Sequence, residues 1–396
     1  MKIEPLHAPR VAHHPALVHF ALAVGGFAIG TTEFATMSLL PYFARDLGID
    51  APTAGNVISA YALGVVVGAP TIAILAAKLS RRTLLIGLML VFAVANGLSG
   101  IAPNYHWMLF FRFLSGLPHG AYFGIAALVA ASLVPPDRRT MAVSRVMLGL
   151  TIATVVGVPL ANILGQVVGW RWGFLLVAAL ALTTALLVAI FAARDVPDEA
   201  ASPLRELGAL RRPQVWLTLA TGAVGFGGLF AVYTYLADTM LEVTKVSPAM
   251  IPVALVLFGT GMTAGTALVP RFADRALMPT AAVLLLWSAV MLLLWPLAAP
   301  HLPTLLLAVF GIGFGGAYGV VLQTRLMDVA GDAQGLAASL HHSAFNTANA
   351  IGPLLGGMAI RAGFGWTSTG YVGCALALGG LAIWLGAWWL SHKPRT

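Results

Sequence analysis

The sequence predicts an all-α membrane protein of twelve transmembrane helices, arranged as two parallel-related six-helix halves. Three observations lead to this prediction: a composition too apolar for a soluble protein, apolar runs of membrane-spanning length, and patterns that recur between the halves. Of the 396 residues, 59% are hydrophobic and only 9% are charged. A soluble domain carries roughly 25% charged residues, so this chain lacks the polar side chains that would cover a water-soluble fold.

Each span is predicted from an apolar run long enough to cross a bilayer as a helix, which takes about 20 residues. The polar N-terminal stretch does not resemble a cleaved signal peptide, so we expect the first run to remain as a span. The runs lie at residues 18–43, 52–77, 82–102, 106–132, 140–166, 171–193, 213–238, 247–271, 278–298, 303–327, 334–361 and 366–390.

The longest polar interruption falls at the midpoint of the chain and contains charges of both signs and several prolines. We interpret this stretch, residues 194–213, as a cytoplasmic linker. It separates a predicted N-terminal six-helix half, residues 1–193, from a C-terminal six-helix half that starts at 214 and ends at 396.

Basic residues concentrate on one side of the predicted membrane. When the N-terminus is placed in the cytoplasm, 17 of the 22 Lys and Arg residues are cytoplasmic, four lie in outer loops and one lies within a span. This positive-inside pattern predicts an even number of spans with both termini cytoplasmic. It also explains the net charge of +8 without a nucleic-acid partner. The cytoplasmic residues are Lys2, Arg10, Lys78, Arg81, Arg82, Arg138, Arg139, Arg145, Arg194, Arg205, Arg211, Arg212, Arg271, Arg275, Arg325, Lys393 and Arg395, and the outer ones are Arg45, Arg171, Lys245 and Arg361.

Two short patterns repeat with the same offset of 196 residues: Gly-Ala-Tyr ends at Tyr122 and again at Tyr318, and Gly-Trp ends at Trp170 and again at Trp366. Small residues also recur every fourth position in the fifth and eleventh spans, which predicts flat faces where helices approach closely. An even number of spans per half makes the repeat parallel and places a transport site between the halves. The small residues are Gly149, Ala153, Gly157, Ala161 and Gly165, and then Ala344, Ala348, Gly352 and Gly356.

Five stretches resemble a known family. They are GTTEFATMSLLPYFARDLGI in the first span, GAPTIAILAAKLSRRTLL at the loop after the second, RFLSGLPHGAYFG in the fourth, GLTIATVVGVPLANILGQ in the fifth and HHSAFNTANAIGP in the eleventh. With them the chain resembles the major facilitator superfamily, and within it the twelve-span drug:proton antiporter group in its arabinose-efflux-permease-like branch. The resemblance implies the major facilitator fold, a bacterial inner-membrane location, and export by alternating access.

The resemblance also implies a conformational loop that acts as a charge latch between helices. In the first half this loop keeps the bases Lys78, Arg81 and Arg82, but it has Ala77 and Ser80 where the family pattern has aspartate and glycine. In the second half, RFADRALMP keeps two members of the pattern, which are Asp274 and Arg275.

Glu33 is the leading candidate for proton coupling and for substrate binding. It lies well inside the first span, without a basic neighbour in sequence. A carboxylate in hydrocarbon costs on the order of several kcal/mol, so burial favours the protonated form. Gly26 and Gly30 share its helix face, so Glu33 is expected to face protein. The alternative is a protonated side chain that ties two helices together.

Arg112 is the base within a span, and it is the second candidate for both roles. Its guanidinium stays protonated and therefore needs a partner or water. Gly116 and His119 share its helix face. Our hypothesis is that Arg112 tunes Glu33 or binds an anionic substrate group. The alternative is a structural tie to backbone carbonyls.

Other polar residues in the spans are weaker candidates for substrate binding. Asp238 is interpreted as a second acidic group of the cavity or, with slight preference, as a solvated helix end. Histidines can titrate near neutral pH, and Asn amides serve substrates or helix contacts equally well. No metal site is predicted, because His341-His342 lacks further ligands at suitable spacing and Cys374 is the single cysteine. These candidates are His119, Tyr233, Tyr235, Asp238, His342, Asn346 and Asn349.

The predicted function is a proton-coupled secondary antiporter that exports a small organic molecule such as a drug, sugar or metabolite. The chain has no Rossmann, Walker or GxSxG motif, so no enzyme activity, nucleotide or cofactor is predicted. The expected partners are protons, a small-molecule substrate and the bilayer, and the expected state is a monomer. Three alternatives stay open: a proton-coupled importer of a nutrient, a non-transporting membrane sensor, and a membrane-embedded enzyme.

Overall fold

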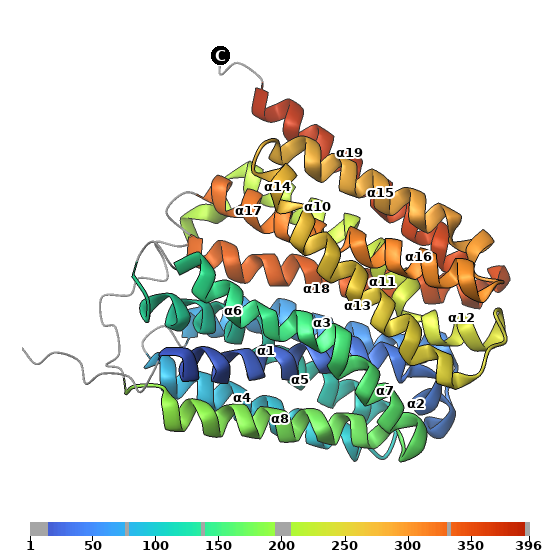
Figure 1. Cartoon of the computed structure of the whole chain (residues 1–396), viewed down its shortest axis with the longest axis horizontal. Coiled ribbons are helices and arrows are strands. Elements are labelled where there is room, and N and C mark those ends of the chain that lie inside the picture. The colour runs from blue at the N-terminus through green and yellow to red at the C-terminus, as the bar shows by residue number, and fades with distance from the viewer. Residues whose placement is uncertain (1–14, 76–78, 136–138, 195–206, 331–333, 393–396) are drawn as a thin grey trace, which may run out of the picture.

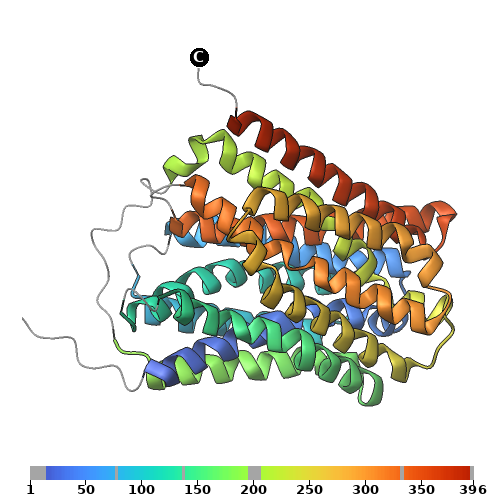
Figure 2. The same ribbon diagram turned by 45° about the horizontal axis from the view of Figure 1, so that its top comes forward.

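The computed structural model describes residues 15–75, 79–135, 139–194, 207–330 and 334–392, and within these ranges every regular element is a helix. The long helices run between two ends of the molecule (Figures 1 and 2). We call the end at which α8 (Trp170–Phe191) finishes and α10 (Pro213–Gly225) begins the linker end. It is at the left of Figure 1, and the opposite end is the distal end.

The first six predicted spans correspond to α1 (Pro15–Ser38) with α2 (Leu40–Leu47), α3 (Ala51–Leu75), α4 (Arg81–Gly100), α5 (Tyr105–Ser132), α6 (Arg139–Ile152) with the π-helical turn η2 (Ala153–Gly157) and α7 (Val158–Val167), and α8. The other six, which follow the short turn η3 (Leu207–Arg211), correspond to α10 with α11 (Gly227–Thr234) and α12 (Leu236–Glu242), η4 (Pro248–Met250) with α13 (Ile251–Leu268) and α14 (Pro270–Ala273), α15 (Leu277–Ala298), α16 (Leu302–Gly315) with α17 (Tyr318–Ala330), α18 (Gln334–Ala359) with η5 (Ile360–Phe364), and α19 (Ser368–His392).

Eleven helical segments in the described ranges are long and apolar enough to cross a membrane. The twelfth predicted span is α18, a helix of 26 residues. It is less apolar because it carries two histidines and two asparagines. The ends of the predicted spans agree with the helices to within about five residues, as expected for boundaries read from sequence. The sequence did not predict the breaks inside the first, fifth, seventh, eighth and tenth spans.

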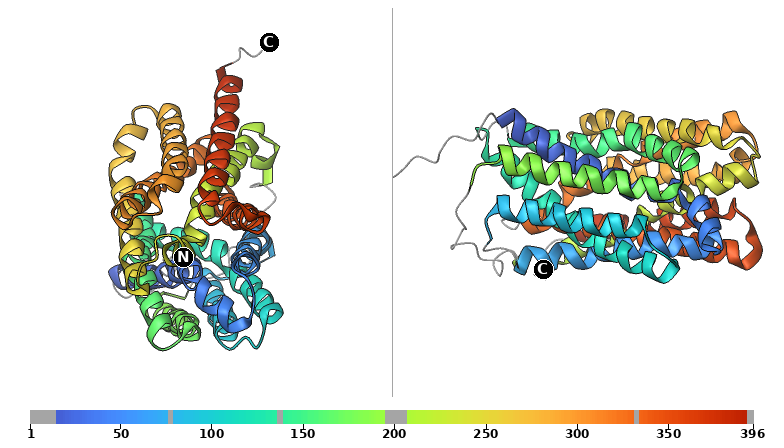
Figure 3. Two further views of the ribbon diagram at one scale, coloured as in Figure 1. Left: turned by 90° about the vertical axis from the view of Figure 1, so that its right-hand side faces the viewer. Right: turned by 90° about the horizontal axis from the view of Figure 1, so that it is seen from below.

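The two halves lie side by side. Seen from the distal end, the blue-to-green helices of the first half gather on one side and the yellow-to-red helices of the second half on the other (Figure 3, left). Across the boundary α3 packs along α18, and α13 packs against η2 and α7. The outcome is the predicted all-α architecture of two six-helix halves.

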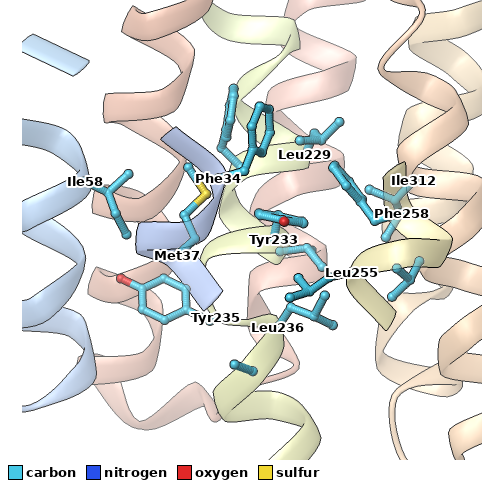
Figure 4. Packing of buried hydrophobic residues seen from close by; sticks show 14 of the residues in the cluster. Phe34, Met37, Ile58, Leu229, Tyr233, Tyr235, Leu236, Leu255, Phe258 and Ile312 are labelled. Carbon is cyan, nitrogen blue, oxygen red and sulfur yellow. The ribbon is translucent and has the colours of Figure 1, made fainter. Parts of the chain in front are cut away.

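Toward the distal end, the halves share one hydrophobic core. Every first-half member of this core comes from the distal part of its helix, as Phe34, Met37 and Ile58 do, and these pack with second-half residues such as Tyr233 and Phe258 (Figure 4). Toward the linker end, the first half has a core cluster of its own and the second half has another. The halves are therefore joined most extensively by apolar packing at the distal end.

The predicted stripes of small residues allow helices of one half to approach closely. A Cβ added at Gly149 of α6 would lie 2.0 Å from the backbone oxygen of Ala23 on α1, and one added at Gly352 of α18 would lie 2.4 Å from the backbone oxygen of Gly227 on α11. The fifth span thus packs on the first as the eleventh packs on the seventh, which is the parallel repeat expected from the sequence.

Replacing Gly149 by Ala is expected to destabilise the folded protein, because α1 and α6 would have to separate to admit the methyl group. Overpacking of this kind costs about 1–3 kcal/mol. The matched control is Gly87→Ala on α4, where an added Cβ meets nothing within 4 Å. Thermal unfolding in detergent, followed by fluorescence size-exclusion chromatography, should show a lower Tm for Gly149→Ala and no loss for Gly87→Ala. Equal behaviour of the two variants would contradict the close contact.

An ion pair fastens α2 to the start of α8 at the distal end. The carboxylate of Asp46 accepts hydrogen bonds from Arg171 and, at 3.1 Å, from Trp170 Nε1. The bond from Arg171 holds the pKa of Asp46 below its ordinary value. A lowered folded-state pKa contributes stability above the ordinary pKa of about 3.9, and this contribution is lost as the pH falls toward the folded-state value.

We expect Asp46→Asn to reduce stability slightly at pH 7, by no more than about 1 kcal/mol, because both side chains of the pair are partly exposed. The difference in Tm from the unmodified protein should shrink as the pH falls below about 4, where the carboxylate becomes protonated in the unfolded chain. Tm measured at pH 7 and at lower pH checks this. A difference that grows on acidification would contradict the assigned pair.

Candidate functional site

Glu33 lies at the boundary between the halves. Its side chain on α1 is only 2% exposed, and Oε1 accepts a hydrogen bond of 3.4 Å from Asn349 Nδ2 on α18. The other carboxyl oxygen, Oε2, is buried without a hydrogen-bond partner, and so is Oδ1 of Asn349. Because α1 and α18 belong to different halves, any separation of the halves at this level breaks the bond and changes the surroundings of the carboxyl group.

Arg112 on α5 is 1% exposed and lies near enough to Glu33 for electrostatic attraction. It donates its hydrogen bonds elsewhere, however: Nη1 lies 3.0 Å from Thr32 Oγ1, 3.4 Å from Asn96 Oδ1 and 3.4 Å from Ser115 Oγ. These partners are side-chain oxygens, not the backbone carbonyls of the structural alternative.

The network around Arg112 reaches the same helix turn as Glu33. Thr32 Oγ1 also donates to Asn96 Oδ1 at 2.7 Å, so α1, α4 and α5 meet at one polar cluster. The guanidinium Cζ lies 4.3 Å from the centre of the Tyr61 ring on α3, a cation–π contact. Sequence reasoning missed Thr32, Asn96 and Tyr61. The signal available for Asn96 was a lone amide inside an apolar run.

His119 and His342 also meet across the boundary. The two ring centres are 5.7 Å apart, and Phe123 stacks on His342 at 5.0 Å with an interplanar angle of 6°. His119 Nδ1 shares a 2.8 Å hydrogen bond with Tyr61 Oη. His119 and the neighbouring His341 are buried, whereas His342 is half-buried.

Asn346 on α18 also lies close to the Glu33 carboxyl group, and Tyr233 of the seventh span packs among aromatic rings. Asn346 Nδ2 donates to the backbone oxygen of His342 at 3.1 Å, which leaves Asn346 Oδ1 buried without a partner. The Tyr233 ring lies 5.6 Å from that of Phe34 and 4.2 Å from that of Phe258 (Figure 4). Beside Tyr233 is a small cavity of about 10 Å³, lined by Val232, Tyr233, Leu236, Phe258, Val309 and Ile312.

Two candidates lie away from Glu33, toward the distal end. Tyr235 Oη donates to the backbone oxygen of Pro353 at 2.9 Å and so ties the seventh span to the eleventh. Asp238 on α12 is 7% exposed and its Oδ2 has no partner. The preferred interpretation of Asp238 as a solvated helix end is therefore wrong. The reason is that the helix resumes after Tyr235 and continues to Glu242, which carries Asp238 inside the protein.

The predicted conformational loops lie at the linker end. Lys78 lies outside the described residues. Arg82, in the first turn of α4, donates to the backbone oxygen of Ala189 on α8, and Arg81 is half-buried. Asp274 and Arg275 occupy an exposed turn between α14 and α15. A charge latch between these loops stays a prediction.

A cavity of about 430 Å³ lies at the surface where α5 begins, lined by Asn104, His106, Trp107 and Phe110. It contains none of the predicted site residues. Aromatic residues at the end of a span are typical of the membrane–water interface, so its size does not make it the functional site.

Comparison with known proteins agrees with this architecture. The family model described as Major Facilitator Superfamily matches residues 22–340 and again 239–396. The inner membrane transport protein YdhP of Escherichia coli (strain K12) is 40% identical over 381 residues, which cover 95% of this chain and 96% of that protein. A chloramphenicol resistance protein of Streptomyces lividans is 37% identical over 344 residues, 85% of this chain and 87% of that protein.

The fold has solved counterparts. A bacterial homologue of the human lysosomal transporter Spinster, in an inward-facing and unoccupied conformation, superimposes with a TM-score of 0.73 at 16% identity, covering 96% of this chain and 99% of that one. The helix arrangement, the doubled family match and the transporter relatives lead to one assignment: the chain belongs to the major facilitator superfamily and is a multi-pass membrane transporter.

Proposed function

We propose that this transporter is a proton-coupled antiporter that exports a small organic molecule by alternating access, with Glu33 as the proton-carrying group. The observation that carries the proposal is the place of this carboxyl group. It is buried between the halves, one oxygen is bonded to Asn349 of the opposite half, and the other has no partner.

The side of the membrane with which such a carboxyl group exchanges its proton depends on which way the carrier opens. In the closed arrangement a charged carboxylate is costly, because water is excluded and one oxygen is unpaired. When the halves part, the bond to Asn349 breaks and water reaches the group, which then exchanges its proton with the exposed side. Arg112 lies nearby and favours the ionised form. A proton bound on one side and released on the other is the step that a proton-driven carrier requires.

The proposed orientation places the linker end in the cytoplasm, in a bacterial inner membrane with both termini inside. It rests on the predicted distribution of basic residues. The proposed halves are residues 1–193 and 214–396, joined by the linker 194–213, and the polar groups between them would receive substrate in a monomer. The conformational loops would gate the linker end.

Inside-out membrane vesicles test the proposal. Vesicles with and without the protein are given an acid lumen and labelled chloramphenicol, suggested by the Streptomyces relative, and then arabinose. An exporter should accumulate at least one of these or another compound of a metabolite panel in the lumen, and a protonophore should abolish the accumulation. Accumulation only in right-side-out vesicles with an acid exterior would show a proton-coupled importer instead. Accumulation that ignores the protonophore would exclude proton coupling.

A further inference from the structure

On the linker side of Glu33, aromatic rings of α5 and α18 form one of the contacts between the halves, beside the packing of α3 along α18. Phe123 stacks on His342, and His119 lies against the same imidazole. We call these three residues the His342 contact. The shared apolar core described above takes its first-half residues from the distal part of the helices. The rings therefore lie where apolar packing between the halves is sparser.

The His342 contact is on the linker side of Glu33. On α18, His342 comes seven residues before Asn349, and on α5, His119 comes seven residues after Arg112. The two helices run in opposite directions, so both displacements point toward the linker end. At 1.5 Å per residue each amounts to about 10 Å. The halves thus meet at two polar levels, one at Glu33 and one at His342.

The ionisable groups around this contact are known from the structure. From the first half, His119 faces His342, and Tyr61 Oη holds His119 through Nδ1. On the same helix, His341 lies with its ring centre 5.5 Å from that of His342. Beyond Tyr61 come Arg112, on the face of its ring, and Glu33. The ring contacts of His342 within the described residues are thus with two further imidazoles and the Phe123 ring.

We propose that His342 is a second proton-binding group of this transporter, and that its protonation opens the linker end. A neutral imidazole packs well between Phe123 and His119. An imidazolium there gains a favourable contact with the face of the Phe123 ring. His342 is half-buried and none of these neighbours is acidic, so its imidazolium would lose hydration without gaining a counter-charge. The closed contact therefore excludes the proton, and a separated, hydrated His342 accepts it.

The direction of the pH effect follows from linkage. Because His342 binds a proton in the open form that it excludes in the closed form, lowering the pH favours the open form through His342, by at most about tenfold per pH unit for one linked proton. Protonation of Glu33 has the opposite effect, because its charged form is the costly one in the closed arrangement. This inference goes beyond the proposed antiport, since it concerns the opening of one end and is measurable without any substrate.

The test measures the distance between two spin labels at the linker end. Ser132 of α5 and Thr324 of α17 are exposed there, one in each half, and are replaced by Cys in a Cys374→Ser background. Pulsed electron–electron double resonance in nanodiscs at pH 8 and pH 5.5 then gives the ratio of the population with a long distance between the labels to the population with a short one. We expect this ratio to rise by up to about tenfold on acidification, which is the limit for one linked proton on a histidine of ordinary pKa in the open form.

Variants assign the response to His342. His342→Phe keeps a ring on Phe123 but cannot bind a proton, so it should stay closed at both pH values. His342→Gln loses the stack and should be more open at both. The control His301→Gln changes an exposed histidine before α16 and should respond as the parent does. Glu33→Gln should keep or enlarge the response, because protonation of Glu33 favours the closed arrangement and opposes the opening.

Two results would overturn the inference: no change of distance with pH in the parent, or an unchanged pH response in His342→Phe. A response that is lost in Glu33→Gln and kept in His342→Phe would likewise exclude His342 as its source. Failure of the antiport proposal would appear in the vesicle assay instead, so the two outcomes are distinguishable.

Discussion

Glu33→Gln should abolish proton-driven accumulation of substrate while leaving passive exchange intact. Glutamine keeps the shape of the side chain and can still hydrogen-bond Asn349, but it cannot carry a proton. The halves should therefore still close and alternate between opening to one side of the membrane and to the other. What is lost is the dependence of that movement on the pH on either side.

Two assays on one preparation of proteoliposomes check this expectation. In the first, an imposed pH gradient drives accumulation of the substrate found in the screen, and Glu33→Gln should show none above protein-free liposomes. In the second, unlabelled substrate inside exchanges for labelled substrate outside without a gradient, and the variant should resemble the parent. Asp238→Asn removes a second buried carboxyl group, at the distal end of the seventh span, and is compared with Glu33→Gln in both assays. Accumulation by Glu33→Gln at the parental level would remove Glu33 from the coupling step.

Arg112→Ala should lose transport by at least about tenfold, although the protein still inserts. The guanidinium supplies hydrogen bonds to three helices through Thr32, Asn96 and Ser115. A hydrogen bond to a charged group contributes about 1.5–3 kcal/mol, and tenfold in rate or affinity corresponds to about 1.4 kcal/mol. Removal also takes away the positive charge nearest to Glu33, which leaves its ionised form more costly.

Arg112→Lys and Arg171→Ala are the matched comparisons. Lysine keeps a charge but not the planar fork of donors, so it should restore part of the activity if charge matters and little if geometry alone matters. Arg171→Ala removes an exposed base at the distal end and should transport normally. Expression and monodispersity, measured alongside, separate loss of function from loss of folding. Normal transport by Arg112→Ala would refute its assignment to the functional site.

The features that could be predicted from the sequence are those that depend on one helix at a time. Apolar runs set the spans, and the small residues beside Glu33 on α1 correctly indicated that its side chain faces protein. The stripe containing Gly149 correctly indicated a close helix contact. In each case the local pattern fixes which face of a helix is buried.

The features that could not be predicted depend on which helices meet. The hydrogen-bond partner of Glu33 is Asn349, which is 316 residues away. From the sequence alone, many other polar residues of the second half could equally have been this partner. Thr32 and Asn96 attracted no attention because a hydroxyl or an amide in a span commonly bonds its own helix. Asp238 was misjudged because polar neighbours in sequence suggested an exposed end. Lys78 lies outside the described residues, and the loop prediction that includes it is untested.

The most direct test of the central claim is the number of protons released when substrate binds to purified protein in weakly buffered detergent solution near neutral pH. The substrate is the compound found in the vesicle screen, and a pH-sensitive dye records the release. If Glu33 exchanges its proton for substrate, the parent protein should release protons on binding and Glu33→Gln should release none, although it still binds. Equal proton release by the two proteins would contradict the account.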